Sequence, residues 1–172
     1  MRRYILVGIL ILMCFLLQST VFQALAFGGI VPNLLVVLTA SFGFMRGEKA
    51  GLIIGFVCGL LCDIFFGDVI GFQALILMYI GYLNGKFSGI FYPEEIKLPM
   101  ALIVLSDLSF GVISYFLLFL MRGRLNFPFY FKTIIVPEVI YTTMVTLILY
   151  PIILKINFAL ETREKNSAQK FV

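Results

Sequence analysis

The stretch Gly51-Leu-Ile-Ile-Gly-Phe-Val-Cys-Gly-Leu-Leu-Cys-Asp63 places glycines four residues apart in an apolar run that ends on a carboxylate. Residues four apart share one face of a helix. In a membrane, glycines on such a face let a second helix approach closely, because helix association there depends on packing. A carboxylate in hydrocarbon needs a partner or water. The stretch therefore predicts a membrane helix that carries a packing face and a polar group requiring an explanation.

The four-residue spacing continues through Gly67 and Gly71, past the end of the apolar run. The candidates for a helix-packing face or a partner interface are Gly51, Gly55, Gly59, Asp63, Gly67 and Gly71. Two uses stay open, because both need small residues. The glycines can pack internally against the next helix of the chain, or externally against the single helix of a partner.

Composition places almost the whole chain in the membrane. Of its 172 residues, 62% are hydrophobic and 13% are charged, and the mean hydropathy is +1.08, whereas soluble domains carry about 25% charged residues. We expect a single integral membrane domain over residues 1–160 and a short, disordered, cytoplasmic polar tail over residues 161–172. The basic residues are scattered, so they do not form the clustered patch of a nucleic-acid-binding protein.

Six apolar segments follow one another, and we predict an all-α, polytopic membrane helix bundle of about six transmembrane helices. The segments are Tyr4–Ala26, Asn33–Met45, Ala50–Phe66, Val69–Phe87, Leu98–Met121 and Ile134–Ile156. The second and third are short, because a spanning helix needs about 20 residues at about 1.5 Å each. Whether the second segment crosses the membrane fully stays open.

The basic residues predict how the bundle lies in the membrane. With the N-terminus inside and six crossings, ten Lys and Arg residues fall on the inner side and three on the outer side. The positive-inside rule then places both termini in the cytoplasm. The three outer residues, Arg122, Arg124 and Lys132, belong to an aromatic loop. They either reach lipid headgroups or offer a contact surface to a partner outside the membrane.

Few residues in the sequence offer catalytic or metal-binding chemistry. The chain has no His, which removes the commonest general base and the commonest metal ligand. Cys14, Cys58 and Cys62 lie in apolar runs, and we interpret them as buried packing residues. We therefore expect no enzyme activity, no metal and no cofactor.

Three acidic residues, Asp63, Asp107 and Glu138, fall within apolar segments whose centres carry no Lys or Arg. Each must be protonated, reach water or accept hydrogen bonds. We expect Asp63 near the outer end of its helix, partly exposed. Glu138 follows Pro137 and is expected in a first helical turn, where the helix dipole favours a carboxylate. A transporter would instead use such acids as a proton or ligand site, and short glycine-rich helices are a pointer to that function.

The order and spacing of several motifs resemble the MreD family of rod shape-determining membrane proteins, over almost the whole chain. The motifs are Pro32-Asn-Leu-Leu, Arg46-Gly-Glu-Lys-Ala-Gly51, Gly55-Phe-Val-Cys-Gly59-Leu-Leu-Cys-Asp63, Gly67, Gly71-Phe-Gln-Ala74 and Gly81-Tyr82-Leu-Asn-Gly85. The last motif adds Gly81, Tyr82 and Gly85 to the candidates for helix packing or a partner interface. Asn33 stands where the family usually has Asp, which is a departure from the pattern.

The resemblance implies a non-catalytic scaffold subunit of the machinery that elongates the wall of rod-shaped bacteria, located in the bacterial cell membrane. It implies an MreC-like bitopic protein as direct partner, and MreB filaments, a RodA-type glycosyltransferase and a penicillin-binding transpeptidase as indirect ones. The family's fold is similar to the substrate-binding subunits of energy-coupling-factor transporters. The alternative function is therefore a small-molecule-binding membrane subunit of such a transporter.

Overall fold

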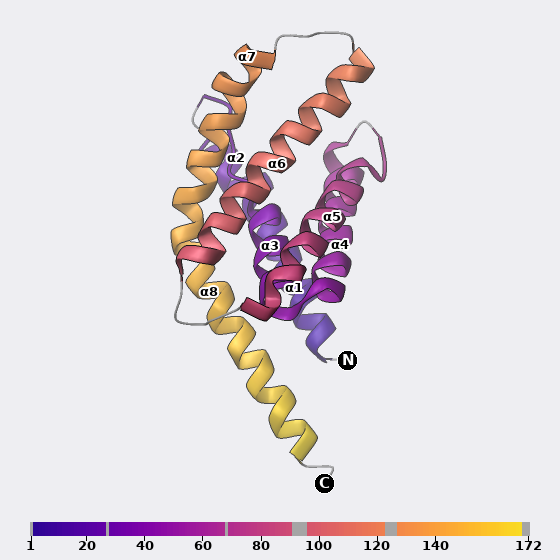
Figure 1. Cartoon of the computed structure of the whole chain (residues 1–172), viewed down its shortest axis with the longest axis vertical. Coiled ribbons are helices and arrows are strands. Elements are labelled where there is room, and N and C mark those ends of the chain that lie inside the picture. The colour runs from indigo at the N-terminus through magenta and orange to yellow at the C-terminus, as the bar shows by residue number, and fades with distance from the viewer. Residues whose placement is uncertain (1, 27, 68, 91–95, 123–126, 170–172) are drawn as a thin grey trace.

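The computed structural model describes residues 2–26, 28–67, 69–90, 96–122 and 127–169, which form a helical bundle (Figure 1). The helices are α1 (Arg2–Leu16), α2 (Phe22–Ala24), α3 (Leu34–Arg46), α4 (Glu48–Phe66), α5 (Phe72–Lys86), α6 (Lys97–Arg122), α7 (Phe127–Tyr130) and α8 (Val136–Gln169). The π-helical segments Leu17–Val21 and Phe131–Ile135 join α1 to α2 and α7 to α8, and a short 3-10 helix, Phe87–Ile90, follows α5. The predicted all-α bundle of six segments is confirmed over the described residues.

Four of the described helical rods are long and apolar enough to cross a membrane: Ile5–Ala24, Glu48–Phe66, Lys97–Leu117 and Phe127–Thr162. The chain is thus a multi-pass membrane protein. The two short helices are α3, with 13 residues, and α5, with 15. The expectation of a short third segment is wrong, because α4 begins at Glu48 and reaches 19 residues. The fourth segment is shorter than the third, because α5 begins only at Phe72 and the residues before it form a turn.

Helix α3 lies at the centre of the bundle. Every residue from Leu34 to Phe44 is buried, and α3 contacts α1, α4, α5, α6 and α8. A helix that is apolar on all sides is typical of a buried position. Because neighbouring helices surround it, α3 can remain about 20 Å long without exposing its ends to lipid.

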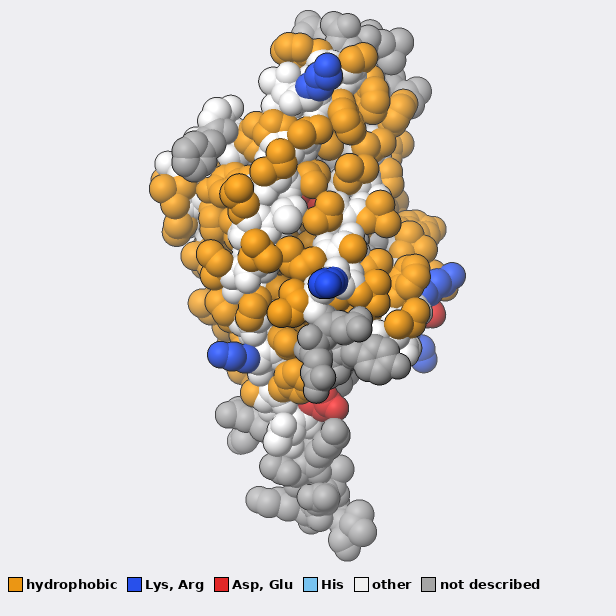
Figure 2. Space-filling model, turned by 60° about the vertical axis from the view of Figure 1, so that its left-hand side comes forward, with side chains coloured by type: hydrophobic (Ala, Val, Ile, Leu, Met, Phe, Trp, Pro, Cys, Tyr) orange, Lys and Arg blue, Asp and Glu red, His pale blue; other side chains and the backbone are white. Residues whose placement is uncertain are grey.

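The two ends of the bundle differ in charge. The N-terminus, the C-terminal end of α8 and the α3–α4 turn lie in the lower part of the molecule as drawn in Figure 1. Figure 2 shows that hydrophobic side chains cover most of the face it presents, and that Lys and Arg lie mainly toward the end that holds the termini. Arg46 and Lys86 close α3 and α5 at this end.

The last helical rod is longer at both ends than the sequence suggested. It begins at Phe127, and backbone dihedral angles stay helical through the junctions at Tyr130 and Val136. Pro137 lacks the N–H that an α-helix needs, and the π-helical segment directly before it widens the helix there. At the other end α8 continues to Gln169, so the tail expected to be disordered is helical that far. Its Glu, Arg, Lys and Gln residues are good helix formers.

Candidate functional site

The glycines of α4 lie directly against the backbone of α5. A Cβ atom on Gly55 would stand 2.6 Å from the carbonyl carbon of Leu77, and one on Gly59 would stand 2.5 Å from the amide nitrogen of Ala74. Ordinary contacts between such atoms are about 3.5–4.0 Å. Gly51 likewise faces Gly81. This face of α4 is therefore filled by another part of the same chain.

Glycines on α5 complete the contact from the other side. A Cβ atom on Gly85 would stand 2.7 Å from the carbonyl carbon of Gly47, and Gly81 meets the backbone of Gly51. Gly43 of α3 also approaches Gly81. Three helices thus come together through backbone-to-backbone contacts. The ring of Tyr82, the remaining candidate of this motif, lies 5.0 Å from Lys86 Nζ.

Asp63 fixes the register of the α4–α5 hairpin. Its carboxylate accepts hydrogen bonds from the backbone N–H groups of Gly71 at 2.9 Å, Gln73 at 2.9 Å and Ala74 at 3.0 Å. These groups belong to the start of α5, where unpaired donors and the helix dipole attract an anion. Asp63 is 1% exposed, so the expected partial exposure is wrong. Donors on α5, and not water, satisfy the charge.

Two further glycines shape the turn between α4 and α5. Gly71 has φ +95°, a left-handed conformation in which a side chain is strained, and it has open space around it. Gly67 follows the last residue of α4, and its N–H donates to the Asp63 carbonyl at 3.1 Å. Neither glycine contacts another helix in the way that Gly51, Gly55 and Gly59 do. They allow the chain to turn so that Asp63 meets the start of α5.

The buried start of α3 is capped by side chains from three parts of the chain. The side-chain oxygen of Asn33 accepts from Val36 N–H at 3.3 Å, and that of Gln18 accepts from Leu35 N–H at 3.2 Å. The N–H of Asn33 donates to Thr142 Oγ1 at 3.1 Å. Asn and Asp cap helices about equally well, so Asn33 fills the position without a charge. Gln18 and Thr142 were not among the candidates from the sequence.

Asp107 of α6 and Glu138 of α8 are the other two acidic candidates within membrane-spanning helices. Asp107 is 2% exposed and neither carboxylate oxygen has a hydrogen-bond partner; Thr142 lies beside it without the geometry of a hydrogen bond. Glu138 is half-buried. The expectation that Glu138 lies in a first helical turn is confirmed, because α8 begins at Val136.

The three basic residues expected in the outer loop lie in different parts of the chain. Arg124 lies outside the described residues, and Arg122 ends α6. Lys132 is exposed but belongs to a helical segment, so the expected outer loop is shorter than predicted. Aromatic rings hold this end of α6 to the next rod: Tyr115 lies 5.2 Å from Phe127 and 4.7 Å from Tyr130, measured between ring centroids.

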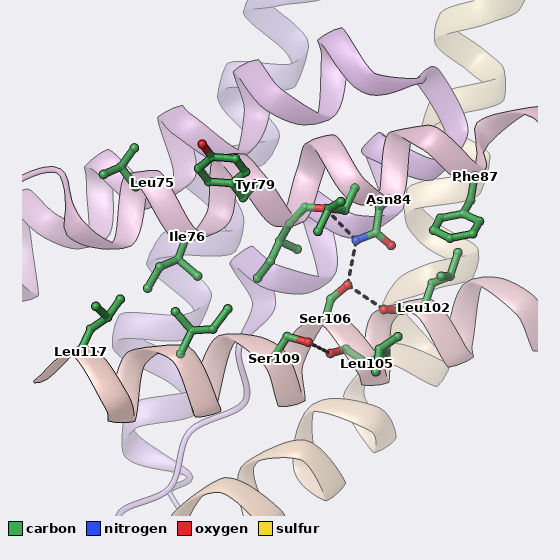
Figure 3. A pocket seen from close by; sticks show the side chains of 13 residues that line it. Leu75, Ile76, Tyr79, Asn84, Phe87, Leu102, Leu105, Ser106, Ser109 and Leu117 are labelled. Atoms are coloured by element: carbon green, nitrogen blue, oxygen red, sulfur yellow. Dashed lines mark hydrogen bonds between the residues drawn. The ribbon is translucent and has the colours of Figure 1, made fainter. Parts of the chain in front are cut away.

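A groove runs between α5 and α6, and we call it the α5–α6 groove. Its volume is about 520 Å³. Leu75, Tyr79 and Leu83 of α5 and Leu105 and Ile113 of α6 are among the side chains that line it (Figure 3). Most of the groove is aliphatic. It opens on the side of α5 opposite to the glycines that contact α4.

One polar bridge joins the two walls of the α5–α6 groove. Asn84 Nδ2 donates to Ser106 Oγ at 2.7 Å and to the Ile80 carbonyl at 2.8 Å, while Ser106 Oγ donates to the Leu102 carbonyl at 2.7 Å (Figure 3). The side-chain oxygen of Asn84 has no partner. An asparagine within an apolar segment was the sequence signal for this bridge, but Asn84 and Ser106 were not chosen as candidates.

The chemistry of the described residues is that of helix packing. Cys14, Cys58 and Cys62 are free and buried, and no group of three or more His, Cys, Asp or Glu residues in the described ranges is arranged to hold a metal ion. The α4–α5 hairpin offers a rigid element, and the α5–α6 groove offers an apolar surface that is open.

Comparison with known proteins gives a match to one family. The family described as rod shape-determining protein MreD matches the chain over residues 2–157. No curated protein and no solved structure matches the chain significantly. The similarity to energy-coupling-factor transporter subunits that the resemblance implied is therefore not confirmed.

Proposed function

The chain belongs to the MreD family of rod shape-determining proteins, and we propose that it acts there as a non-catalytic scaffold subunit of the cell-wall elongation machinery. Its role in determining rod shape comes from the family. The scaffold role is our inference from the fold. Helices and short connections make up the described residues, so the protein must act through helix faces and short segments.

We further propose that its direct partner is an MreC-like protein with a single transmembrane helix. Through that protein the chain would connect to MreB filaments, a RodA-type glycosyltransferase and a penicillin-binding transpeptidase, and so help to organise peptidoglycan synthesis. The proposed location is the bacterial cell membrane, with both termini in the cytoplasm. The gathering of basic residues at the end of the bundle that holds the termini supports this orientation.

The observation that carries the scaffold proposal is that one face of α5 is packed within the bundle and the opposite face is exposed. One face is held against α4 and α3 by backbone contacts at Gly81 and Gly85. The other face, with Leu75, Tyr79 and Leu83, is exposed. A helix that is fixed on one side and apolar on the other is suited to present a rigid surface to a membrane partner.

The transporter alternative receives less support from the geometry. Binding sites for small polar molecules combine an apolar lining with convergent polar groups. The α5–α6 groove has mainly aliphatic walls, and its Asn84 and Ser106 side chains are already hydrogen-bonded to each other. We therefore retain the transporter only as an outcome of the experiment.

The proposal is tested by purifying the tagged chain from native membranes in mild detergent and identifying the accompanying proteins by mass spectrometry. The control is an unrelated multi-pass protein with the same tag. Enrichment of an MreC-like protein and wall-synthesis enzymes supports the scaffold. Enrichment of a transmembrane coupling subunit with paired ATPases would overturn it in favour of transport.

A further inference from the structure

The glycine-lined face of α4 is occupied within the chain, so a partner helix cannot use it. Gly51, Gly55 and Gly59 each lie so close to α5 that even one added carbon would overlap the α5 backbone. A partner must therefore contact a different surface. Among the described residues, the α5–α6 groove is an open apolar recess of about 520 Å³.

The dimensions of the α5–α6 groove match a stretch of helix. It extends from Leu75 of α5 to Phe87 of the following 3-10 helix, and along α6 from Leu102 to Leu117. At about 1.5 Å per residue these walls are roughly 18 and 22 Å long. That is more than half of the roughly 30 Å hydrocarbon thickness. An occupant of this length is itself a membrane-crossing chain or a lipid tail.

Polar groups on the groove walls distinguish a helix from a lipid tail. Tyr79 lies at the middle of α5 with 61% of its surface exposed, and Ser109 lies on the opposite wall. Asn84 is 5% exposed and its side-chain oxygen is buried below the same walls, so Tyr79 and Ser109 carry the polar groups that an occupant meets. An acyl chain has no donor or acceptor for such groups. A helix carrying Ser, Thr, Asn or Gln has both, and these residues join helices across membranes.

Small side chains at the floor favour close approach of a helix. Ser106 and Ser109 lie one turn apart on α6, and each hydroxyl donates to a carbonyl of its own helix at 2.7 Å. Their hydrogens are therefore used; the Ser106 oxygen already accepts from Asn84 Nδ2, while the Ser109 oxygen can still accept. Small hydroxyl residues of this kind are typical of contacts between transmembrane helices.

We propose that the α5–α6 groove receives the single transmembrane helix of the partner chain, with a hydroxyl or amide side chain of that helix at the level of Tyr79 and Ser109. This inference rests on the proposed function, because it assigns the surface through which the scaffold binds its single-span partner. The hairpin of α4 and α5 holds one wall of the groove rigid, so the surface is formed before the partner arrives.

The assignment is tested by placing a photoreactive amino acid at Leu105, in the groove, and at Ile148, on α8 outside it. Both positions are exposed, at 60% and 72%. We expect the Leu105 variant to form a covalent product whose cross-linked peptide comes from the transmembrane segment of the single-span partner. We expect the Ile148 variant to give no such product.

A second pair of variants measures the same contact by filling the groove. Leu105→Trp is expected to lower the yield of co-purified partner roughly tenfold, which corresponds to about 1.4 kcal/mol. Ile148→Trp is expected to leave it unchanged. Leu83→Trp fills the opposite wall and repeats the test if Leu105→Trp does not yield a monodisperse protein.

Each other outcome contradicts the assignment. Unchanged partner yield with Leu105→Trp and Leu83→Trp, or cross-linking only at Ile148, would show that the partner binds elsewhere, and the scaffold function would stand. Products at Leu105 with lipid alone or with a second copy of this chain would assign the groove to those occupants. Failure of the wild-type chain to retain any single-span protein would overturn the proposed function and the groove together.

Discussion

Replacing Gly55 by alanine tests the close contact between α4 and α5 most sharply. The new Cβ atom would lie 2.6 Å from the carbonyl carbon of Leu77 and 3.0 Å from the amide nitrogen of Met78. Both are backbone atoms, so no side-chain rotation can relieve the overlap. Reaching an ordinary contact of about 3.5 Å requires α4 and α5 to separate by about 1 Å.

The cost of this separation can be estimated from packing energies. A gap of about 0.5–1 Å removes a quarter to a half of each attractive contact along an interface, and overpacking a core typically costs about 1–3 kcal/mol. We expect Gly55→Ala to lower the free energy of unfolding by an amount in this range, and Gly55→Leu by more. Alanine is the better helix former by about 1 kcal/mol. Without the overlap, Gly55→Ala would therefore raise the free energy of unfolding, so a decrease indicates the close contact.

The matched control is Gly8→Ala in α1, where a Cβ atom would meet nothing within 4 Å. The free energy of unfolding is measured for the purified proteins by titration with a denaturing detergent, and size-exclusion chromatography follows the folded fraction. We expect Gly8→Ala to be neutral or stabilising. If Gly55→Ala is as stable as Gly8→Ala, the backbone contact between α4 and α5 is refuted.

Substitutions at three further positions test the helix caps and the turn between α4 and α5. Asp63→Asn should impair cell shape less than Asp63→Leu in a complementation assay with protein levels measured alongside. Asn keeps one of the two oxygens that accept the three N–H bonds. Equal damage from both substitutions would mean that the negative charge itself is required. Asn33→Asp should leave the free energy of unfolding of the purified protein unchanged. Asn33→Leu removes the α3 cap and should lower it by about 1 kcal/mol. Equal stability of the two variants would refute the cap. Gly71→Ala should cost about 1–2 kcal/mol for the left-handed conformation at φ +95°, with Gly71→Asn less costly; no difference from wild type would remove the need for glycine there.

The six apolar segments of the bundle could be predicted because a membrane protein shows its helices as apolar runs. The central position of α3 could not. Lipid tails are as apolar as a protein interior, so a buried face and a lipid-facing face carry the same kinds of residue. The run Leu34–Phe44 is apolar whether it lies at the centre or at the edge, and only its shortness hinted at protection by other helices.

The partners of polar residues were harder to predict than the residues themselves. Asp63 stood out as a carboxylate in an apolar run, but its partners are backbone N–H groups of Gly71, Gln73 and Ala74, which every non-proline residue carries. Glu138 could be placed in the first turn of α8, because Pro137 is typical of a helix start, but the helical backbone before that turn could not be predicted. Here a π-helical segment accommodates the proline within a longer rod.

The central claim, that this chain binds a single-span partner of the rod-shape machinery through its own helices, is tested most directly with two purified components. The chain and the MreC-like protein are reconstituted together in lipid nanodiscs, and the mass of the particles is measured without any third protein. The account predicts a defined complex of the two chains, lost with Leu105→Trp and retained with Ile148→Trp. Particles that contain only one or the other protein at all ratios would contradict it.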